Sequence, residues 1–156
     1  MNTYRHYFNI DPEYFPAVNP DVIRHNPDLW KKFYPHPSFV KLLKDTVAVL
    51  SRQQKLNIWV DGAYGTGKSH AVLTLQHLLE ASGDETKAYF EQFKLDRDLY
   101  KKFASVKSQG KILTVHRYGS SSINGDNDLF LTIQESISNA LKDVGIDDAS
   151  GMLALK

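Results

Sequence analysis

Apolar residues recur at helical spacing in four stretches of the chain after residue 38. Residues three or four positions apart share one side of a helix, so the spacing predicts helices over residues 38–50, 68–81, 84–106 and about 129–144. Ser38 is a good N-cap for the first helix, and Gly83 and Gly145 end the second and the last. The third stretch is long enough for one helix or for two.

Two short apolar runs between these helices have the length and composition of strands. Leu56–Val60 precedes a glycine-rich loop, and Ile112–His116 follows Gly110. Both runs are bounded by polar or turn-forming residues, which is typical of strands. Strands that alternate with helices form parallel sheets, so the pattern predicts an α/β fold with a parallel sheet flanked by helices.

The first 37 residues differ in composition from the rest of the chain. They hold all six prolines, all nine glycines lie from residue 62 onward, and half of the 18 aromatic residues lie within residues 1–40. Prolines at this spacing exclude a long helix, and so many aromatic residues argue against disorder. We expect residues 1–37 to be a lead-in with a short helical turn at 27–34. It packs on a domain that comprises residues 38–156.

Composition excludes several classes of protein. The 156 residues suit one domain, and the absence of cysteine excludes disulfides, thiolate nucleophiles, zinc fingers and iron–sulfur clusters. No apolar run approaches the roughly 18 residues of a membrane span, and the N-terminus lacks a secretory signal, so we expect a cytoplasmic protein without membrane contact. The net charge of +1 gives no overall electrostatic footprint for nucleic acid.

One motif points to a specific chemistry. Residues 62–69 are Gly-Ala-Tyr-Gly-Thr-Gly-Lys-Ser, which fits the phosphate-binding pattern G-x-x-x-x-G-K-[ST]. A predicted strand precedes it and a predicted amphipathic helix follows, as in a P-loop NTPase, so the expected cofactors are ATP and Mg²⁺. The alternative is a glycine-rich turn before an ordinary helix. That alternative leaves unexplained a lysine at the positive end of the helix dipole.

The residue types of the loop give each position a role. Glycines allow backbone angles that side chains forbid, so consecutive N–H groups from about Tyr64 to Ser69 surround a phosphate. Lys68 reaches the β- and γ-phosphate oxygens and is the candidate catalytic residue, and Ser69 binds Mg²⁺ through its hydroxyl. Asp61 either tethers Lys68 when nucleotide is absent or only solvates the strand end. The candidate nucleotide-binding residues are Gly62, Tyr64, Gly65, Thr66, Gly67, Lys68 and Ser69.

A second acid is missing from the expected places. An ATPase normally ends a later strand with Asp, which orients Mg²⁺ and the attacking water, but Ile112–His116 ends without one. We therefore expect the N-terminal part of a larger ATPase with an incomplete sheet, or else a complete small protein with a degenerate site. His116 and Arg117, at the end of the predicted strand, either sense the γ-phosphate or pack structurally.

Residues 35–145 resemble the start of large prokaryotic AAA+/STAND-type ATPases. The resemblance is carried by LNIWVDGAYGTGKSH, a helix ending LLEASG, a charged helical insert, KILTVHRYGSSS and the helix LFLTIQESISNAL. Similar proteins include the ATPases of antiphage defence systems, such as the BrxC/PglY proteins of BREX. The resemblance implies a motor or switch module in a long chain that oligomerises or binds other defence-system subunits. DNA is an implied partner of the full-length protein only.

The same resemblance implies roles for particular positions. It assigns phosphate and metal contacts to Gly62, Gly67, Lys68 and Ser69, and it places residues 34–39 near the adenine. Two other functions stay open. The first is a small-molecule or nucleotide kinase, which needs arginines at the transferring phosphate, whereas only Arg97 and Arg117 follow the loop. The second is a nucleotide-binding assembly module without hydrolysis.

The remaining candidate residues favour structural roles. The histidines show no metal-binding spacing, since His70 and His77 are seven positions apart on one helix. One set of aromatic residues either stacks on bases or forms core, and core is favoured at helical spacing: Tyr89, Phe90, Phe93, Tyr100 and Phe103. One set of lysines fits a solvated face better than a DNA track: Lys101, Lys102, Lys107 and Lys111.

Overall fold

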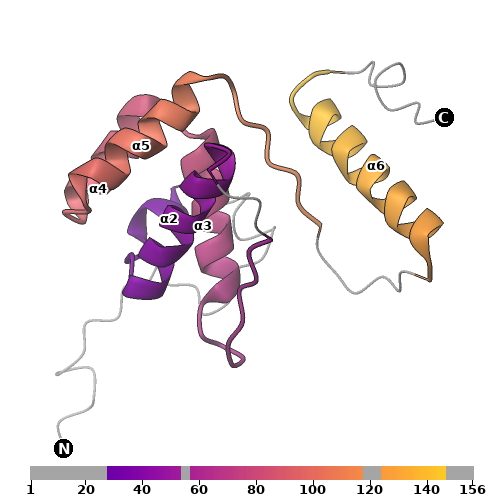
Figure 1. The fold of residues 1–156 in the computed structure, drawn as a ribbon, viewed down its shortest axis with the longest axis horizontal. Helices are drawn as coiled ribbons and strands as arrows, with labels where there is room; N and C mark the ends of the chain where they lie inside the picture. Colours follow the sequence, from indigo (N-terminus) through magenta and orange to yellow (C-terminus); the bar gives the residue numbers. More distant parts are fainter. Residues whose placement is uncertain (1–27, 54–56, 118–123, 147–156) are drawn as a thin grey trace, which may run out of the picture. The chain divides into compact units, whose positions relative to one another are not determined.

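A computed structural model describes residues 28–53, 57–117 and 124–146, and every regular element in these ranges is a helix (Figure 1). The elements are η2 (Leu29–Lys32), α2 (Pro37–Leu50), α3 (Lys68–Glu80), α4 (Gly83–Gln92), α5 (Arg97–Ser108) and α6 (Asp126–Asp143). The chain divides into two compact units, with the boundary between Leu75 and Gln76 inside α3. The first unit contains η2, α2 and the start of α3, and the second contains the remaining helices.

The predicted α/β fold, a parallel sheet flanked by helices, is wrong for the described residues, which contain no strand. Leu56 lies outside the described residues, while residues 57–60 and 111–117 run as irregular segments. A strand forms only when a neighbour pairs with its N–H and C=O groups, and two short strands make a marginal sheet. A helix satisfies its own backbone groups locally. Strand-like composition was therefore not enough to form a sheet here.

The first unit is organised around α2 and the aromatic residues before it. The helix begins at Pro37, and its N-cap is His36, whose Nδ1 accepts a hydrogen bond from the Phe39 N–H at 3.3 Å. The predicted N-cap, Ser38, lies instead within the first turn, since Pro37 takes the first helical position, which needs no N–H donor. The ring of Phe33 packs edge-on against Phe39, with 4.9 Å between centroids.

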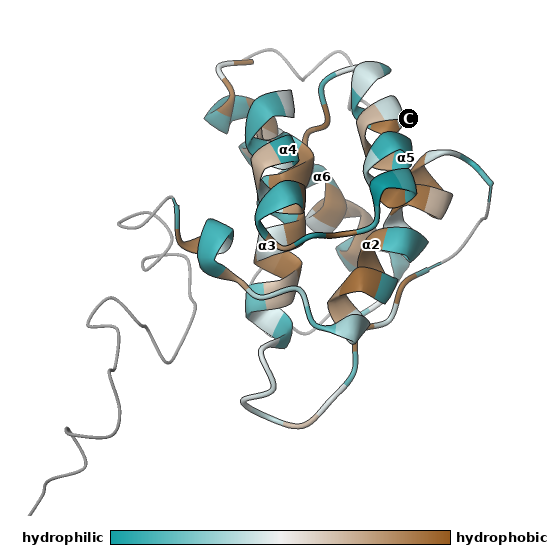
Figure 2. Cartoon of the chain, turned by 90° about the vertical axis from the view of Figure 1, so that its left-hand side faces the viewer, coloured by the Kyte–Doolittle hydropathy of each residue, from teal (hydrophilic) through white to brown (hydrophobic). Residues whose placement is uncertain are grey.

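One face of α2 supplies much of the buried surface of the first unit. Figure 2 shows hydrophobic and hydrophilic positions distributed unevenly around this helix. The buried residues of α2 are Phe39, Leu42, Leu43, Thr46 and Val47. From the lead-in, the short helix η2 adds the buried Trp30, and the predicted helical turn at 27–34 is confirmed at Leu29–Lys32. Lead-in residues 1–27 lie outside the described residues.

In the second unit, the predicted stretch 84–106 forms two helices, α4 and α5. Ser82 and Glu85 form a capping box at the start of α4, where the Glu85 N–H donates to the Ser82 hydroxyl at 3.2 Å. Asp96 caps α5 by accepting a hydrogen bond from the Leu99 N–H at 2.7 Å. The break between the helices thus comes from a second local N-cap, which the apolar periodicity did not reveal.

The aromatic residues of α4 and α5 form the core between these helices. Tyr89, Phe90 and Phe103 are buried, and the rings of Phe90 and Phe103 lie 5.8 Å apart between centroids. The structural interpretation of these three residues is confirmed. The last helix, α6, forms where it was predicted and has no buried residue.

Candidate functional site

The loop of residues 62–67 leads directly into α3, and its glycines shape its backbone. Gly65 and Gly67 have φ angles of 79° and 80°, in the left-handed region that side chains disfavour. These angles turn the chain tightly just before Lys68, the first residue of α3. The motif glycines therefore meet a conformational requirement of this turn.

The Lys68 ammonium is folded back over the loop. Its Nζ donates to the carbonyl oxygens of Gly62 at 2.6 Å and Ala63 at 2.5 Å, and lies 3.4 Å from the Thr66 hydroxyl. That hydroxyl in turn donates to the Ala63 carbonyl at 2.8 Å. Two other residues predicted to form the site, Gly62 and Thr66, thus lie beside the Lys68 ammonium.

Asp61 contacts the loop backbone rather than the lysine. Its Oδ1 accepts a hydrogen bond from the Gly62 N–H at 2.7 Å. This bond holds the carboxylate at the entrance of the loop. The tether between Asp61 and Lys68, one of the two roles considered for Asp61, is not formed, because backbone carbonyls occupy the ammonium.

The N-terminus of α3 points unpaired donors at the loop. The first helical hydrogen bond runs from the Ala71 N–H to the Gly67 carbonyl at 2.9 Å, so the N–H groups of Lys68, Ser69 and His70 precede the helical ladder. Their partial positive charge attracts anions. Ser69 is exposed in this first turn, where its hydroxyl is accessible. Lys68 and this helix end give the loop a positive potential.

His70 connects the first turn of α3 to the lead-in. Its ring lies 4.7 Å from that of Phe33, and its burial lowers the pKa of the imidazole, an effect opposed by a hydrogen bond with the Leu29 backbone. A lowered pKa keeps the imidazole neutral near pH 7. This contact fixes the helix end that carries the loop.

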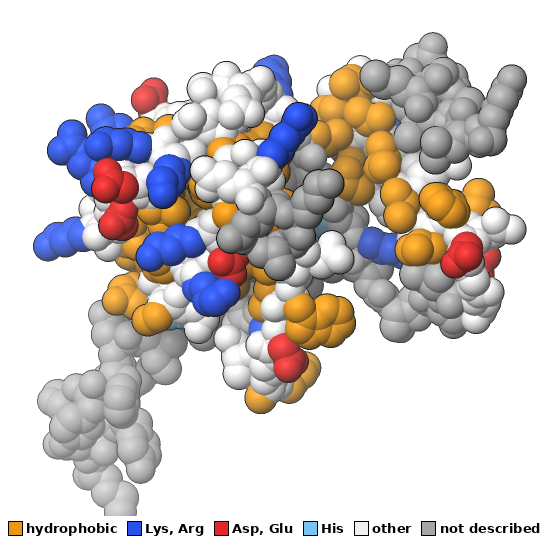
Figure 3. Space-filling view, in the orientation of Figure 1, with side chains coloured by type: hydrophobic (Ala, Val, Ile, Leu, Met, Phe, Trp, Pro, Cys, Tyr) orange, Lys and Arg blue, Asp and Glu red, His pale blue; other side chains and the backbone are white. Residues whose placement is uncertain are grey.

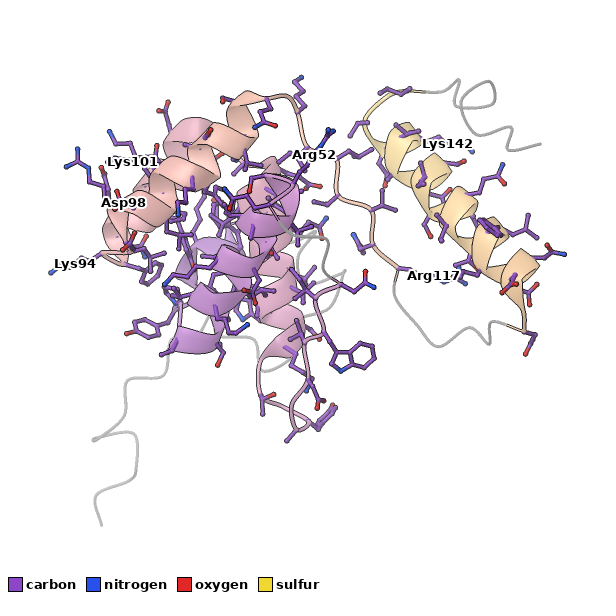
Figure 4. All side chains as sticks on the ribbon, viewed as in Figure 1. Arg52, Lys94, Asp98, Lys101, Arg117 and Lys142 are labelled. Atoms are coloured by element: carbon purple, nitrogen blue, oxygen red, sulfur yellow. The ribbon has the colours of Figure 1, made fainter. Side chains whose placement is uncertain are left out.

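His116 and Arg117 belong to the second unit, at the end of the irregular segment 111–117, where Figure 4 labels Arg117. Their predicted position at the end of a strand is not formed, because the strand is not formed. Of residues 34–39, which the resemblance places near adenine, Tyr34 is exposed and Phe39 is buried.

Lys107 has a role that sequence reasoning missed. Its Nζ donates to the carbonyls of Leu78 at 2.7 Å and Ala81 at 2.5 Å, and to the Thr86 hydroxyl at 2.9 Å. Burial lowers the pKa of this ammonium, and the Glu85 carboxylate opposes the shift. The prediction of a solvated lysine face is therefore wrong at Lys107. The exposed Lys101, labelled in Figure 4, pairs with Asp98 on its own helix, at 3.2 Å.

A cleft of about 1240 Å³ lies in the second unit. Its lining includes Glu80, Lys107, Lys111 and His116, and none of residues 62–69. The Glu80 carboxylate also accepts hydrogen bonds from the N–H and the hydroxyl of Thr114, which attaches the segment 111–117 to the end of α3. The residues that line this cleft and the residues of the motif are therefore different.

Within ranges 28–53, 57–117 and 124–146, no three side chains of His, Cys, Asp or Glu gather as a metal site would require. None of the helices in the same ranges has both the length and the apolar character that crossing a bilayer demands.

The chain matches no protein-family model, no curated protein and no solved structure. The resemblance to defence ATPases therefore stays a prediction that rests on the residues quoted for it.

Proposed function

We propose that residues 62–69 bind the phosphate chain of ATP together with Mg²⁺. The observation that supports this most directly is the position of Lys68, whose ammonium lies within 2.6 Å of two loop carbonyls at the positive end of α3. Lysine, helix N-terminus and left-handed glycines are the three parts of an anion cradle. The proposal rests on all three parts together.

When a phosphate binds, the Lys68 ammonium exchanges its carbonyl partners for phosphate oxygens, which attract it more strongly. The carbonyls of Gly62 and Ala63 are neutral acceptors, whereas phosphate oxygens carry charge. A charged acceptor adds Coulomb attraction to the hydrogen bond with the ammonium, which a neutral carbonyl does not. Because Lys68 is already ordered beside the loop, little side-chain entropy remains to be lost when a phosphate arrives.

In this proposal the chain is the nucleotide-binding module of an ATPase that acts as a motor or switch. A role in antiphage defence, with an oligomer or other defence subunits as partners, rests on the resemblance of residues 35–145 alone. Ser69 is the proposed Mg²⁺ ligand, because its hydroxyl follows Lys68 in the first turn of α3.

The test is calorimetric titration of the chain with Mg·ATP. Lys68→Ala removes the only side-chain cation of the motif and should weaken binding by about tenfold or more, since a hydrogen bond to a charged group is worth about 1.5–3 kcal/mol. Lys41→Ala is the matched control, because Lys41 is an exposed lysine that pairs with Asp45 of its own helix, α2. Equal ATP affinity for the parent and Lys68→Ala would overturn the proposal.

A further inference from the structure

Two aromatic side chains stand exposed on either side of Gly62. Trp59 is 89% exposed and Tyr64 is fully exposed, while Trp30 and Phe33 of the same unit are buried. Figure 3 shows hydrophobic side chains on the surface of the loop that precedes α3. Exposed aromatic side chains beside a predicted phosphate site are candidates for contact with the rest of the ligand.

The position of these residues in the loop defines what they can contact. Tyr64 immediately precedes Gly65, and Trp59 lies two residues before Asp61, whose carboxylate holds the loop entrance. If the phosphates lie at the Lys68 ammonium, the rest of the ligand can rest against side chains that this loop leaves exposed. Aromatic faces on that surface suit a flat, weakly polar group such as a nucleobase.

We propose that Trp59 and Tyr64 form a stacking surface for the base of the nucleotide whose phosphates occupy residues 62–69. This inference rests on the proposed function and names its ligand class as nucleoside triphosphates, in preference to inorganic polyphosphates. Stacking uses the π-face that every base has, so ATP and GTP bind with similar affinity. Phe39, which the resemblance places near the adenine, is 1% exposed and offers no free face to a base.

The experiment compares ATP with tripolyphosphate, which carries phosphates but no base, in titrations of the whole chain. Trp59→Leu and Tyr64→Leu should each lower ATP affinity by about fivefold or more and leave tripolyphosphate affinity unchanged. Trp59→Phe keeps an aromatic face and should retain most of the ATP affinity. Phe130→Leu is the matched control, because Phe130 is an exposed aromatic residue of the second unit.

Fluorescence supplies a second readout that local unfolding would not mimic. The chain has two tryptophans, of which Trp30 is buried and Trp59 exposed, so ATP should quench Trp59 emission while tripolyphosphate does not. The quenching should disappear in Trp59→Phe.

Three results would overturn the inference. Unchanged ATP affinity in both leucine variants, with tripolyphosphate still bound, would remove the stacking surface and leave the phosphate site standing. Loss of ATP affinity in Tyr34→Leu instead would place the base at the exposed Tyr34. If the parent bound neither ligand, the proposed function and this inference would fail together.

Discussion

Lys68 and Lys107 both bind backbone carbonyls near an end of α3, and neither contact was predicted from the sequence. Lys68 was predicted to bind phosphate, and its partners in the structure are carbonyls of its own loop, five and six positions away. Lys107 reaches carbonyls that are 29 and 26 positions away, at Leu78 and Ala81. No local pattern encodes such a contact, and an isolated lysine in a polar stretch is indistinguishable from a solvated one.

At the scale of single residues, we expect Ser69 to contribute to Mg²⁺ binding and Lys68 to contribute to phosphate binding. Ser69→Ala should reduce the enhancement of ATP binding by Mg²⁺ and leave metal-free ADP binding largely intact, because the backbone cradle needs no side chain. Titrations with and without Mg²⁺ measure both quantities. The assignment of Ser69 is wrong if Mg²⁺ enhances binding equally in the parent and the variant.

At the scale of elements, the helices were predictable and the sheet was not. The helices over 38–50, 68–81 and 129–144 appear as α2, α3 and α6 with ends shifted by a few residues. Apolar periodicity and caps are local signals, and they decide where a helix forms. Residues 57–60 and 112–116 carry strand-like composition, but strand formation depends on a pairing partner that no local signal supplies.

Lys107 of α5 should stabilise the protein through its hydrogen bonds at the end of α3. Lys107→Met keeps the aliphatic stem but leaves the carbonyls of Leu78 and Ala81 and the buried Thr86 hydroxyl without their common donor. The free energy of unfolding, measured in urea, should fall by about 1–2 kcal/mol. Lys102→Met, at an exposed position of the same helix, is the control and should change it by less than about 0.5 kcal/mol. Equal effects of the two changes would contradict the prediction.

At the scale of the whole molecule, the phosphate loop and the residues predicted to sense the γ-phosphate belong to different units. The loop lies before the boundary at Leu75, and His116 and Arg117 lie after it. The motif itself was predictable because its spacing is specific. The division of the chain was not, since it falls within a continuous helix that shows no change in composition.

We expect the chain to bind ATP but to hydrolyse it very slowly. Hydrolysis needs an acid that orients water and a cation that meets transition-state charge, and the acid beside the loop, Asp61, is engaged by the Gly62 N–H. Binding that is equal in the ground and transition states does not raise the chemical rate. Purified chain should therefore release phosphate far more slowly than about 1 s⁻¹, the low end of ordinary enzyme rates. A rate near that value, absent from Lys68→Ala, would show a complete catalytic site.

The boundary inside α3 also determines how the protein comes apart. A cut between Leu75 and Gln76 would leave Lys68–Leu75 on one piece and Gln76–Glu80 on the other. Both fragments are shorter than the roughly 12–15 residues at which an isolated helix becomes even marginally stable in water. Each unit alone would therefore hold only a short piece of the helix that supports the phosphate loop. We expect neither unit to fold stably without the other, and the whole chain to unfold in a single transition.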